Sequence, residues 1–143
     1  MGDVIIAQLK PINAENREAV TRLSVSSHQR QYIATNEDSL KEAQDNIEVA
    51  RPFAIYIDDK IVGFTMFAFD ENNEDPCDKY WLWRFMIDSS LQQKGYGSAA
   101  LKEIIKYFRE NGADEITLSK IYIISLKYIF LLHKQHHRFH YLM

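Results

Sequence analysis

The sequence predicts an α+β domain in which helices flank a central, mixed but mostly antiparallel sheet. A strand pattern, a helix pattern and a second strand pattern follow one another over residues 80–119, and such a unit joins two roughly parallel strands through a crossover helix. Two apolar stretches, residues 53–57 and 61–67, are separated only by Asp58-Asp59-Lys60, which predicts an antiparallel hairpin. The chain has 143 residues, the size of one domain.

The first half of the chain predicts one strand and two helices before the hairpin. Residues 4–9 form a β pattern that Pro11 ends. Asn13 is a suitable cap for the helix that follows it. The run Ser39-Leu40-Lys41-Glu42 is a capping box, which predicts that a second helix opens there and ends before Arg51-Pro52.

The second half predicts a strand, a helix and a last short strand after an acidic loop. Leu101, Ile104, Ile105 and Phe108 recur at helical spacing, and Gly112 stands where a C-cap glycine belongs. The predicted order is therefore β-α-α-β-β-β-α-β, followed by a stretch without a clear assignment. The segments are a loop over 70–79, a strand over 80–87, a turn over 88–94, a helix over 95–111 and a strand over 115–119.

Composition and charge exclude several classes of protein. The single cysteine, Cys77, excludes an internal disulfide framework and a Cys-rich zinc site. A formal net charge of −3 argues against a nucleic-acid partner. The N-terminus lacks a signal-peptide pattern, and the apolar stretch 121–132 is too short to span a bilayer. We expect a cytoplasmic protein with neither a nucleic-acid nor a membrane partner.

A change in composition near residue 120 marks a boundary. All 20 acidic residues lie at or before Glu115, whereas residues 120–143 carry four basic residues, four of the five histidines and no acid. We expect residues 1–119 to form the main domain and residues 120–143 an atypical basic, apolar C-terminal segment of it. His133 and His137 have helical spacing, but no acid lies between or after them, so we expect a basic tail and no metal site.

The segment that carries chemistry is a strand followed by the pattern Gln-x-x-Gly-x-Gly from Gln92 to Gly97, and then a helix. Glycines there let the backbone approach a ligand, and the free N–H groups and dipole of the helix form an anion site. Lys94 adds a positive charge, so a pyrophosphate is the expected anion. A dinucleotide fingerprint would need a third glycine where Ala100 stands, and the nucleoside-triphosphate motif is absent.

The run Gln92-Gln93-Lys94-Gly95-Tyr96-Gly97-Ser98-Ala99 resembles the (Gln/Arg)-x-x-Gly-x-(Gly/Ala) acetyl-CoA motif of the GNAT (Gcn5-related) N-acetyltransferases. Arg84-Phe85-Met86-Ile87-Asp88 resembles the fourth strand of that family. Residues 31–40, 52–56 and 62–64 resemble its bacterial spermine/spermidine acetyltransferase branch. The resemblance covers roughly residues 3–119 and implies a GNAT-like acyl-CoA N-acyltransferase fold, with a truncated or atypical C-terminal part.

The resemblance implies transfer of an acetyl group from acetyl-CoA to a primary amine, in particular a polyamine such as spermidine or spermine. Acetyl-CoA is the only cofactor that it implies, and no metal is involved. The strand would pair with the pantetheine arm and the loop amides would hold the pyrophosphate. The cofactor-binding residues implied in this way are Phe85, Met86, Ile87, Gln92, Gln93, Lys94, Gly95, Tyr96, Gly97 and Ser98.

A polyamine carries cations along an apolar chain, so its site should combine carboxylates with aromatic rings. Glu37, Asp38 and Glu42 lie in the segment where the family places its acceptor wall, and Trp83 lies on the strand that leads to the cofactor. Each has an alternative explanation. Acids favour a helix N-terminus in any protein, and a tryptophan is often a packing residue.

The resemblance ends after Ser119. Family members continue with a helix whose tyrosine often acts as general acid, but this chain has no matching motif and no obvious place for a final β-hairpin. The catalytic residue therefore stays unassigned, with Tyr122 and Tyr128 as weak candidates that are equally suited to packing. An alternative function is a catalytically impaired protein that only binds acetyl-CoA. The stretch 121–132 is apolar on nearly every side, which predicts a homodimer in which this stretch is covered.

Overall fold

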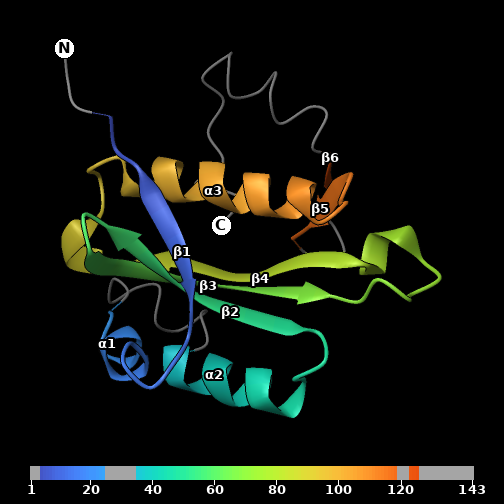
Figure 1. The fold of residues 1–143 in the computed structure, drawn as a ribbon, viewed down its shortest axis with the longest axis horizontal. Helices are drawn as coiled ribbons and strands as arrows, with labels where there is room; N and C mark the ends of the chain where they lie inside the picture. Colours follow the sequence, from blue (N-terminus) through green and yellow to red (C-terminus); the bar gives the residue numbers. More distant parts are fainter. Residues whose placement is uncertain (1–3, 25–34, 119–122, 126–143) are drawn as a thin grey trace.

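The computed structural model describes residues 4–24, 35–118 and 123–125, which form a six-stranded sheet with helices on both faces. The elements are β1 (Ala7–Pro11), α1 (Arg17–Thr21), α2 (Asn36–Asp45), β2 (Ala50–Ile57), β3 (Lys60–Phe69), the 3-10 turn η1 (Pro76–Asp78), β4 (Tyr80–Ile87), the 3-10 turn η2 (Ser89–Leu91), α3 (Tyr96–Glu110), β5 (Glu115–Thr117) and β6 (Ile123–Ser125). The strands lie side by side in chain order. Figure 1 shows α3 over one face of the sheet and α1 and α2 over the other.

The predicted α+β class and the predicted mixture of strand directions are confirmed. All neighbouring strands pair antiparallel except β4 and β5, which pair parallel across the α3 crossover. The hairpin predicted around Asp58-Asp59-Lys60 is formed by β2 and β3. Both aspartates of its turn have positive φ, a conformation that Asp tolerates better than most residues.

The first strand and the first helix both begin later than the sequence predicts. β1 starts three residues later and runs through Pro11, which is tolerated because β1 lies at the edge of the sheet. The side-chain oxygen of Asn13 accepts hydrogen bonds from the backbone N–H groups of Glu15 and Asn16, at 2.8 and 3.0 Å. Asn13 therefore stabilises a turn ahead of α1 and does not cap the helix directly.

The second helix begins before its predicted capping box. The hydroxyl of Thr35 accepts a hydrogen bond from the backbone N–H of Asp38 at 3.0 Å, which places the N-cap at Thr35. Ser39, the predicted cap, is buried inside α2 instead. The prediction was wrong because Thr35 and Ser39 both satisfy the local rule, and the packing of Ser39 against the sheet decides between them.

The C-terminal end of the sheet contains a strand that the sequence did not predict. β5 ends at Thr117, two residues earlier than expected, and β6 pairs antiparallel with it in the register Glu115↔Ser125. The stretch around β6 is apolar at nearly every position, so it carries no alternation from which a strand could be recognised. The remaining residues of the 120–143 segment lie outside the described residues.

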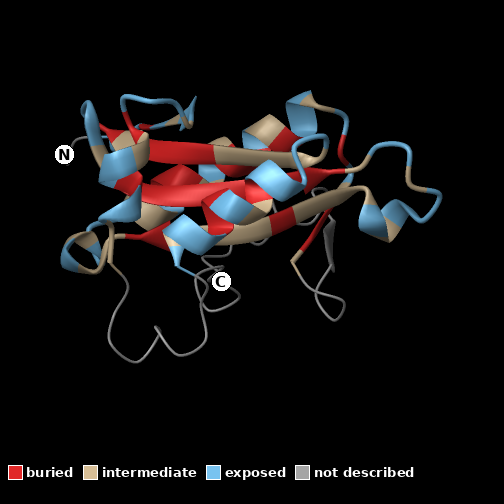
Figure 2. Ribbon diagram, turned by 90° about the horizontal axis from the view of Figure 1, so that it is seen from below, coloured by how far each residue is buried: buried red, intermediate tan, exposed pale blue. Residues whose placement is uncertain are grey.

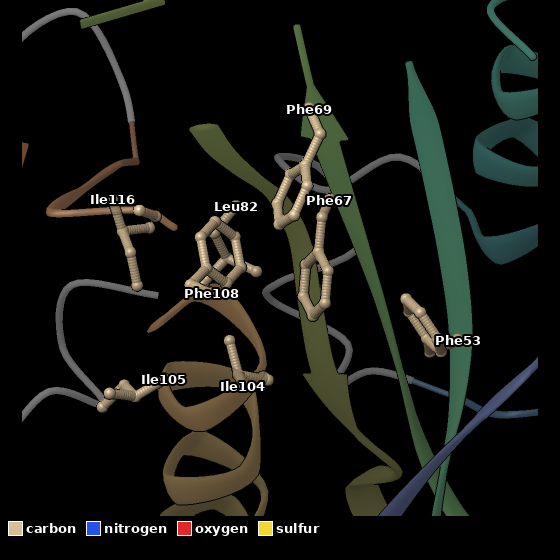
Figure 3. Packing of buried hydrophobic residues seen from close by; sticks show 9 residues of the cluster. Phe53, Phe67, Phe69, Leu82, Ile104, Ile105, Phe108 and Ile116 are labelled. Carbon is tan, nitrogen blue, oxygen red and sulfur yellow. The ribbon is translucent and has the colours of Figure 1, made fainter. Parts of the chain in front are cut away.

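The core has one layer on each face of the sheet, and Figure 2 shows the buried residues concentrated along the strands. Beneath α3 lies an aromatic cluster, shown in Figure 3, in which the rings of Phe67 and Phe108 meet edge-on with centroids 4.7 Å apart. The other layer packs under α1 and α2 and consists of Val20, Leu40, Ala43, Ala54, Phe64, Met66 and Met86. No helix within the described ranges is long and apolar enough to cross a membrane.

Candidate active site

The second half of β4 has a free edge. β4 pairs with β3 along its length, but within the described residues a single register pair, Trp81↔Thr117, joins it to β5. The two parallel strands separate beyond that pair, and Figure 1 shows β5 beside only one end of β4. The backbone groups of residues 82–87 on that side therefore have no strand partner among the described residues, and an extended amide-bearing molecule can pair with them.

A β-bulge in β4 determines which side chains face each layer. Met66 pairs with Arg84 and Phe67 with Leu82, so Trp83 is the extra residue. Leu82 and Phe85 pack in the layer beneath α3, whereas Trp83 packs on the α2 side and Arg84 hydrogen-bonds to Ser39 of α2. Two consecutive side chains therefore face α2 at the point where β4 leaves β5.

The loop after β4 positions the start of α3 beside the end of this free edge. The side-chain amide of Gln92 donates a hydrogen bond to the carbonyl oxygen of Ile87 at 3.0 Å, which ties the loop to the strand. Gln93 and Gly95 have φ values of +65° and +84°, and these left-handed residues turn the chain sharply into the helix. The structure thus brings together the strand and loop residues from which the sequence predicts a cofactor site.

The N-terminus of α3 provides the anion-binding geometry. Gly95 is the N-cap, and Ala99 is the first residue whose N–H bonds back to it, at 3.1 Å, so the amides of residues 96–98 have no partner within the helix. A Cβ built on Gly97 would lie 3.9 Å from Cγ1 of Ile87, which shows how closely the helix start approaches β4. Free amides beside a free strand edge fit the pyrophosphate and the amide-bearing arm of CoA.

The side chain of Asp88 connects the loop after β4 to the segment after α1. Its carboxylate accepts hydrogen bonds from the backbone N–H of Ser24 at 2.7 Å and from the hydroxyls of Ser24 and Ser90. In return, the N–H of Ser89 donates to the carbonyl of Ser24 at 2.7 Å. Partial burial works to raise the pKa of Asp88, but these hydrogen bonds outweigh it and leave the pKa below its ordinary value.

The replacement Asp88→Asn is expected to lower the free energy of unfolding by about 1–2 kcal/mol at neutral pH, because hydrogen bonds to a carboxylate are stronger than those to an amide. A lowered pKa in the folded state means that this stabilisation is present above the unfolded-state value of about 3.9 and is lost as pH falls through the folded-state value. Urea unfolding at neutral pH and at about pH 3 should show the difference between variant and wild type shrinking in acid.

The matched control for this measurement is Asp114→Asn, at an exposed position after α3. It should change the stability little at either pH. If Asp88→Asn and Asp114→Asn behave alike, the hydrogen bonds around Asp88 do not stabilise the loop.

The structure places three of the four candidate acceptor residues on α2. Glu37 and Asp38 are exposed in its first turn, and Lys41 lies 4.0 Å from Glu37. Glu42 forms an ion pair of 2.8 Å with Arg84, the residue that follows Trp83 on β4. No hydrogen bond or ion pair among the described residues joins Glu37 or Asp38 to β4. Trp83 is half-buried and packs against the apolar layer under α2, so part of its role is structural.

The two weak candidates for the catalytic residue, Tyr122 and Tyr128, lie outside the described residues, as does the His-rich end of the chain. Burial raises the pKa of the Cys77 thiol, and nearby Asp75 and Glu115 raise it further, which opposes the formation of a nucleophilic thiolate. No three metal-ligating side chains cluster in the described part of the chain.

Sequence reasoning missed Ser24, Asp88 and Arg84 as residues that organise this site. The Asp88-Ser89-Ser90 run was a local signal, because short polar side chains of this kind often bond to nearby backbone groups. The partnership with Ser24 spans 64 positions and the pairing of Arg84 with Glu42 spans 42. No local pattern predicts contacts of that range.

The family model described as "Acetyltransferase (GNAT) family" matches residues 17–123. The "Spermine/spermidine N(1)-acetyltransferase" of Bacillus subtilis (strain 168) is 33% identical over 106 residues, which are 71% of this chain and 68% of that protein.

Two solved structures share the fold at low sequence identity. An acetyltransferase from Thermus thermophilus superposes with a TM-score of 0.58 and 19% identity, over 78% of this chain and 73% of its own. The ribosomal L7/L12 alpha-N-protein acetyltransferase RimL in complex with coenzyme A superposes with a TM-score of 0.54 and 18% identity, over 79% of this chain and 72% of its own. The free edge of β4, the amides at the start of α3 and these matches agree: the chain belongs to the GNAT family of acetyltransferases and uses acetyl-CoA.

Proposed function

We propose that this protein transfers the acetyl group of acetyl-CoA to a primary amine of a polyamine such as spermidine or spermine. The observation that carries the proposal is the exposed acidic first turn of α2, on the helix that Arg84 ties to β4. The similarity to a Bacillus spermine/spermidine acetyltransferase supports the same acceptor class. Acids along one helix suit an acceptor whose charges repeat along a chain.

In this proposal the residues divide into three roles. The free edge of β4 from Phe85 to Ile87 pairs with the pantetheine arm, and the loop and helix start from Gln92 to Ser98 bind the pyrophosphate. The carboxylates of α2 and the ring of Trp83 bind the cationic acceptor. An amine with a pKa of about 10.4 must lose a proton before it attacks the thioester, so a carboxylate or an ordered water must accept that proton.

The function is tested by acetyl-CoA turnover with spermidine and spermine, compared with a monoamine and with a peptide that begins with serine. Direct calorimetric binding of CoA is measured in parallel. Turnover with the polyamines above both other acceptors supports the proposal. Binding without any turnover supports the alternative of a catalytically impaired CoA-binding protein, and preference for the peptide assigns a protein N-terminus as acceptor.

Among the candidate acceptor carboxylates Glu37, Asp38 and Glu42, we expect the replacement of Asp38 to have the largest effect on the KM for spermidine. Glu37 lies near Lys41 and Glu42 is paired with Arg84, whereas no Lys or Arg of the described residues lies within ion-pair distance of the Asp38 carboxylate. Asp38→Asn should therefore raise the KM for spermidine about two- to fivefold, the effect of one exposed charge pair. The KM for the monoamine should change less, because a monoamine has no second cationic group for the Asp38 carboxylate to bind.

The matched control is Asp45→Asn, which removes an exposed carboxylate from the last turn of the same helix. It should leave the KM for spermidine unchanged. Neutralising Glu37, Asp38 and Glu42 together should raise that KM further, and an unchanged KM in the triple variant would move the acceptor site away from α2.

We also propose that residues 120–143 belong to the same domain and that the chain forms a homodimer through residues 121–132. The pairing of β6 with β5 supports the first part, because it joins this segment to the sheet. The apolar composition of the stretch supports the second, since apolar surface costs about 25 cal/mol per Å² in water. Light scattering at micromolar concentration tests it, and a stable monomer would contradict it.

A further inference from the structure

Arg84 lies on β4, the candidate cofactor strand, and its half-buried side chain reaches α2, the helix of the candidate acceptor wall. All three guanidinium nitrogens of Arg84 donate hydrogen bonds. Nη2 donates to Oε2 of Glu42 at 2.8 Å, and Nε donates to the hydroxyl of Ser39 at 3.2 Å, so both reach α2. Nη1 donates to the carbonyl oxygen of Trp83 at 3.0 Å, within β4 itself.

The hydrogen bond to the Trp83 carbonyl connects the Arg84 side chain to the stretch of β4 next to the part that is proposed to bind the cofactor. Trp83 is the extra residue of the bulge and has no register partner on β3. On the next residue, the Arg84 carbonyl accepts a hydrogen bond from the buried hydroxyl of Thr65 at 2.7 Å. Both carbonyls of the irregular stretch thus accept hydrogen bonds from side chains, immediately before Phe85, Met86 and Ile87, the part of the free edge proposed to pair with the pantetheine arm.

We propose that Arg84 is a positioning residue for both substrates of the transfer. Its planar, rigid guanidinium fixes the bulge through Trp83 and thereby the direction of the free edge, and it holds the acceptor helix against the same strand through Glu42 and Ser39. The inferred effect of Arg84 on CoA binding requires only that the chain belongs to the GNAT family. Its inferred effect on acceptor binding rests on the proposed polyamine function. A lysine could supply the charge to Glu42 but cannot make the three-way fork.

The test compares Arg84→Met, Arg84→Lys and Glu42→Gln in the full chain, with CoA affinity measured by calorimetry and KM for spermidine measured by turnover. We expect Arg84→Met to weaken CoA binding about tenfold and to raise the KM for spermidine, because a small misplacement of binding groups is costly. Arg84→Lys should restore the KM for spermidine but not the affinity for CoA. Glu42→Gln should change the KM for spermidine more than the affinity for CoA.

The control for simple destabilisation is Arg51→Met. Arg51 is also half-buried, with hydrogen bonding to Tyr107 at 3.0 Å and an ion pair with Glu71 at 3.9 Å, but it lies at the start of β2 on the α3 side of the sheet. It should lower the thermal unfolding temperature without changing CoA affinity.

Two results would overturn the inference: wild-type CoA affinity in Arg84→Met, or an equal loss of affinity in Arg51→Met at a similar unfolding temperature. If Arg84→Met does not fold, Arg84→Lys decides, and wild-type CoA affinity there overturns the cofactor half. If the wild-type chain does not turn over spermidine, the polyamine proposal fails, and CoA affinity still tests the role of Arg84.

Discussion

Replacing Gly97 with valine is expected to weaken CoA binding about 100-fold while the domain stays folded. A Cβ at this position would lie 3.9 Å from Ile87, so the protein itself has room for it. In the proposed site, the added branch would instead obstruct the approach of the pyrophosphate to the free amides at the start of α3. Losing one or two charge-assisted hydrogen bonds of about 1.5–3 kcal/mol each corresponds to a loss of that size.

Calorimetric titration with CoA measures this effect, and Lys102→Val serves as its control because Lys102 is exposed further along the same helix. Gly97→Ala should fall between wild type and valine, since its single methyl group intrudes less. Unchanged affinity in Gly97→Val would remove the helix start from the binding site.

Replacing Gly63 with alanine is expected to lower the free energy of unfolding by about 3 kcal/mol, the upper end of what overpacking costs. A Cβ on Gly63 would lie 2.3 Å from the carbonyl oxygen of Met86 and 2.9 Å from Cδ1 of Ile87. The carbonyl is backbone and cannot move aside without disturbing the pairing of Gly63 with Ile87. β3 and β4 must therefore separate locally, next to the strand proposed to bind the pantetheine arm.

Urea unfolding tests this expectation, with Gly97→Ala as a control that makes the same chemical change elsewhere. Gly97 lies in the first turn of α3, and alanine is about 0.5–1 kcal/mol more favourable than glycine inside a helix. The two substitutions should thus have opposite signs. Similar destabilisation by both would mean that crowding against Met86 is not the cause.

The parts of the fold that the sequence predicts best are those determined by local pattern. The strand ending at Ile87, the glycine-containing loop and the amphipathic α3 follow from an apolar stretch, a glycine pair and a helical repeat within about thirty residues of one another. The proposed cofactor site lies on these features. The free amides at the start of α3 could therefore be predicted from the residues alone, and the binding of an anion to them stays a prediction.

The parts that the sequence does not predict depend on packing between distant segments. The bulge at Trp83 has no signature of its own, because a run such as Tyr80-Trp81-Leu82-Trp83 is apolar in either register. The start of α2 depends on the burial of Ser39. The ion pair of Glu42 depends on Arg84, which lies on another element, β4. The sequence places the three candidate acceptor carboxylates in or just before the first turn of one helix, and the structure places all three on α2, but the sequence does not single out Asp38 as the one without a cationic neighbour among the described residues.

Within the described residues, β4 and β5 share a single register pair, so backbone hydrogen bonds contribute little to holding the β5–β6 ribbon on the other four strands. Its attachment there depends chiefly on side-chain packing, such as that of Ile116 in the cluster beneath α3. A molecule that lies along the free edge of β4 would bridge the two parts of the sheet. By thermodynamic linkage, a ligand bound along that edge should make the two parts of the sheet unfold more cooperatively, and removal of the ligand should make them unfold less cooperatively.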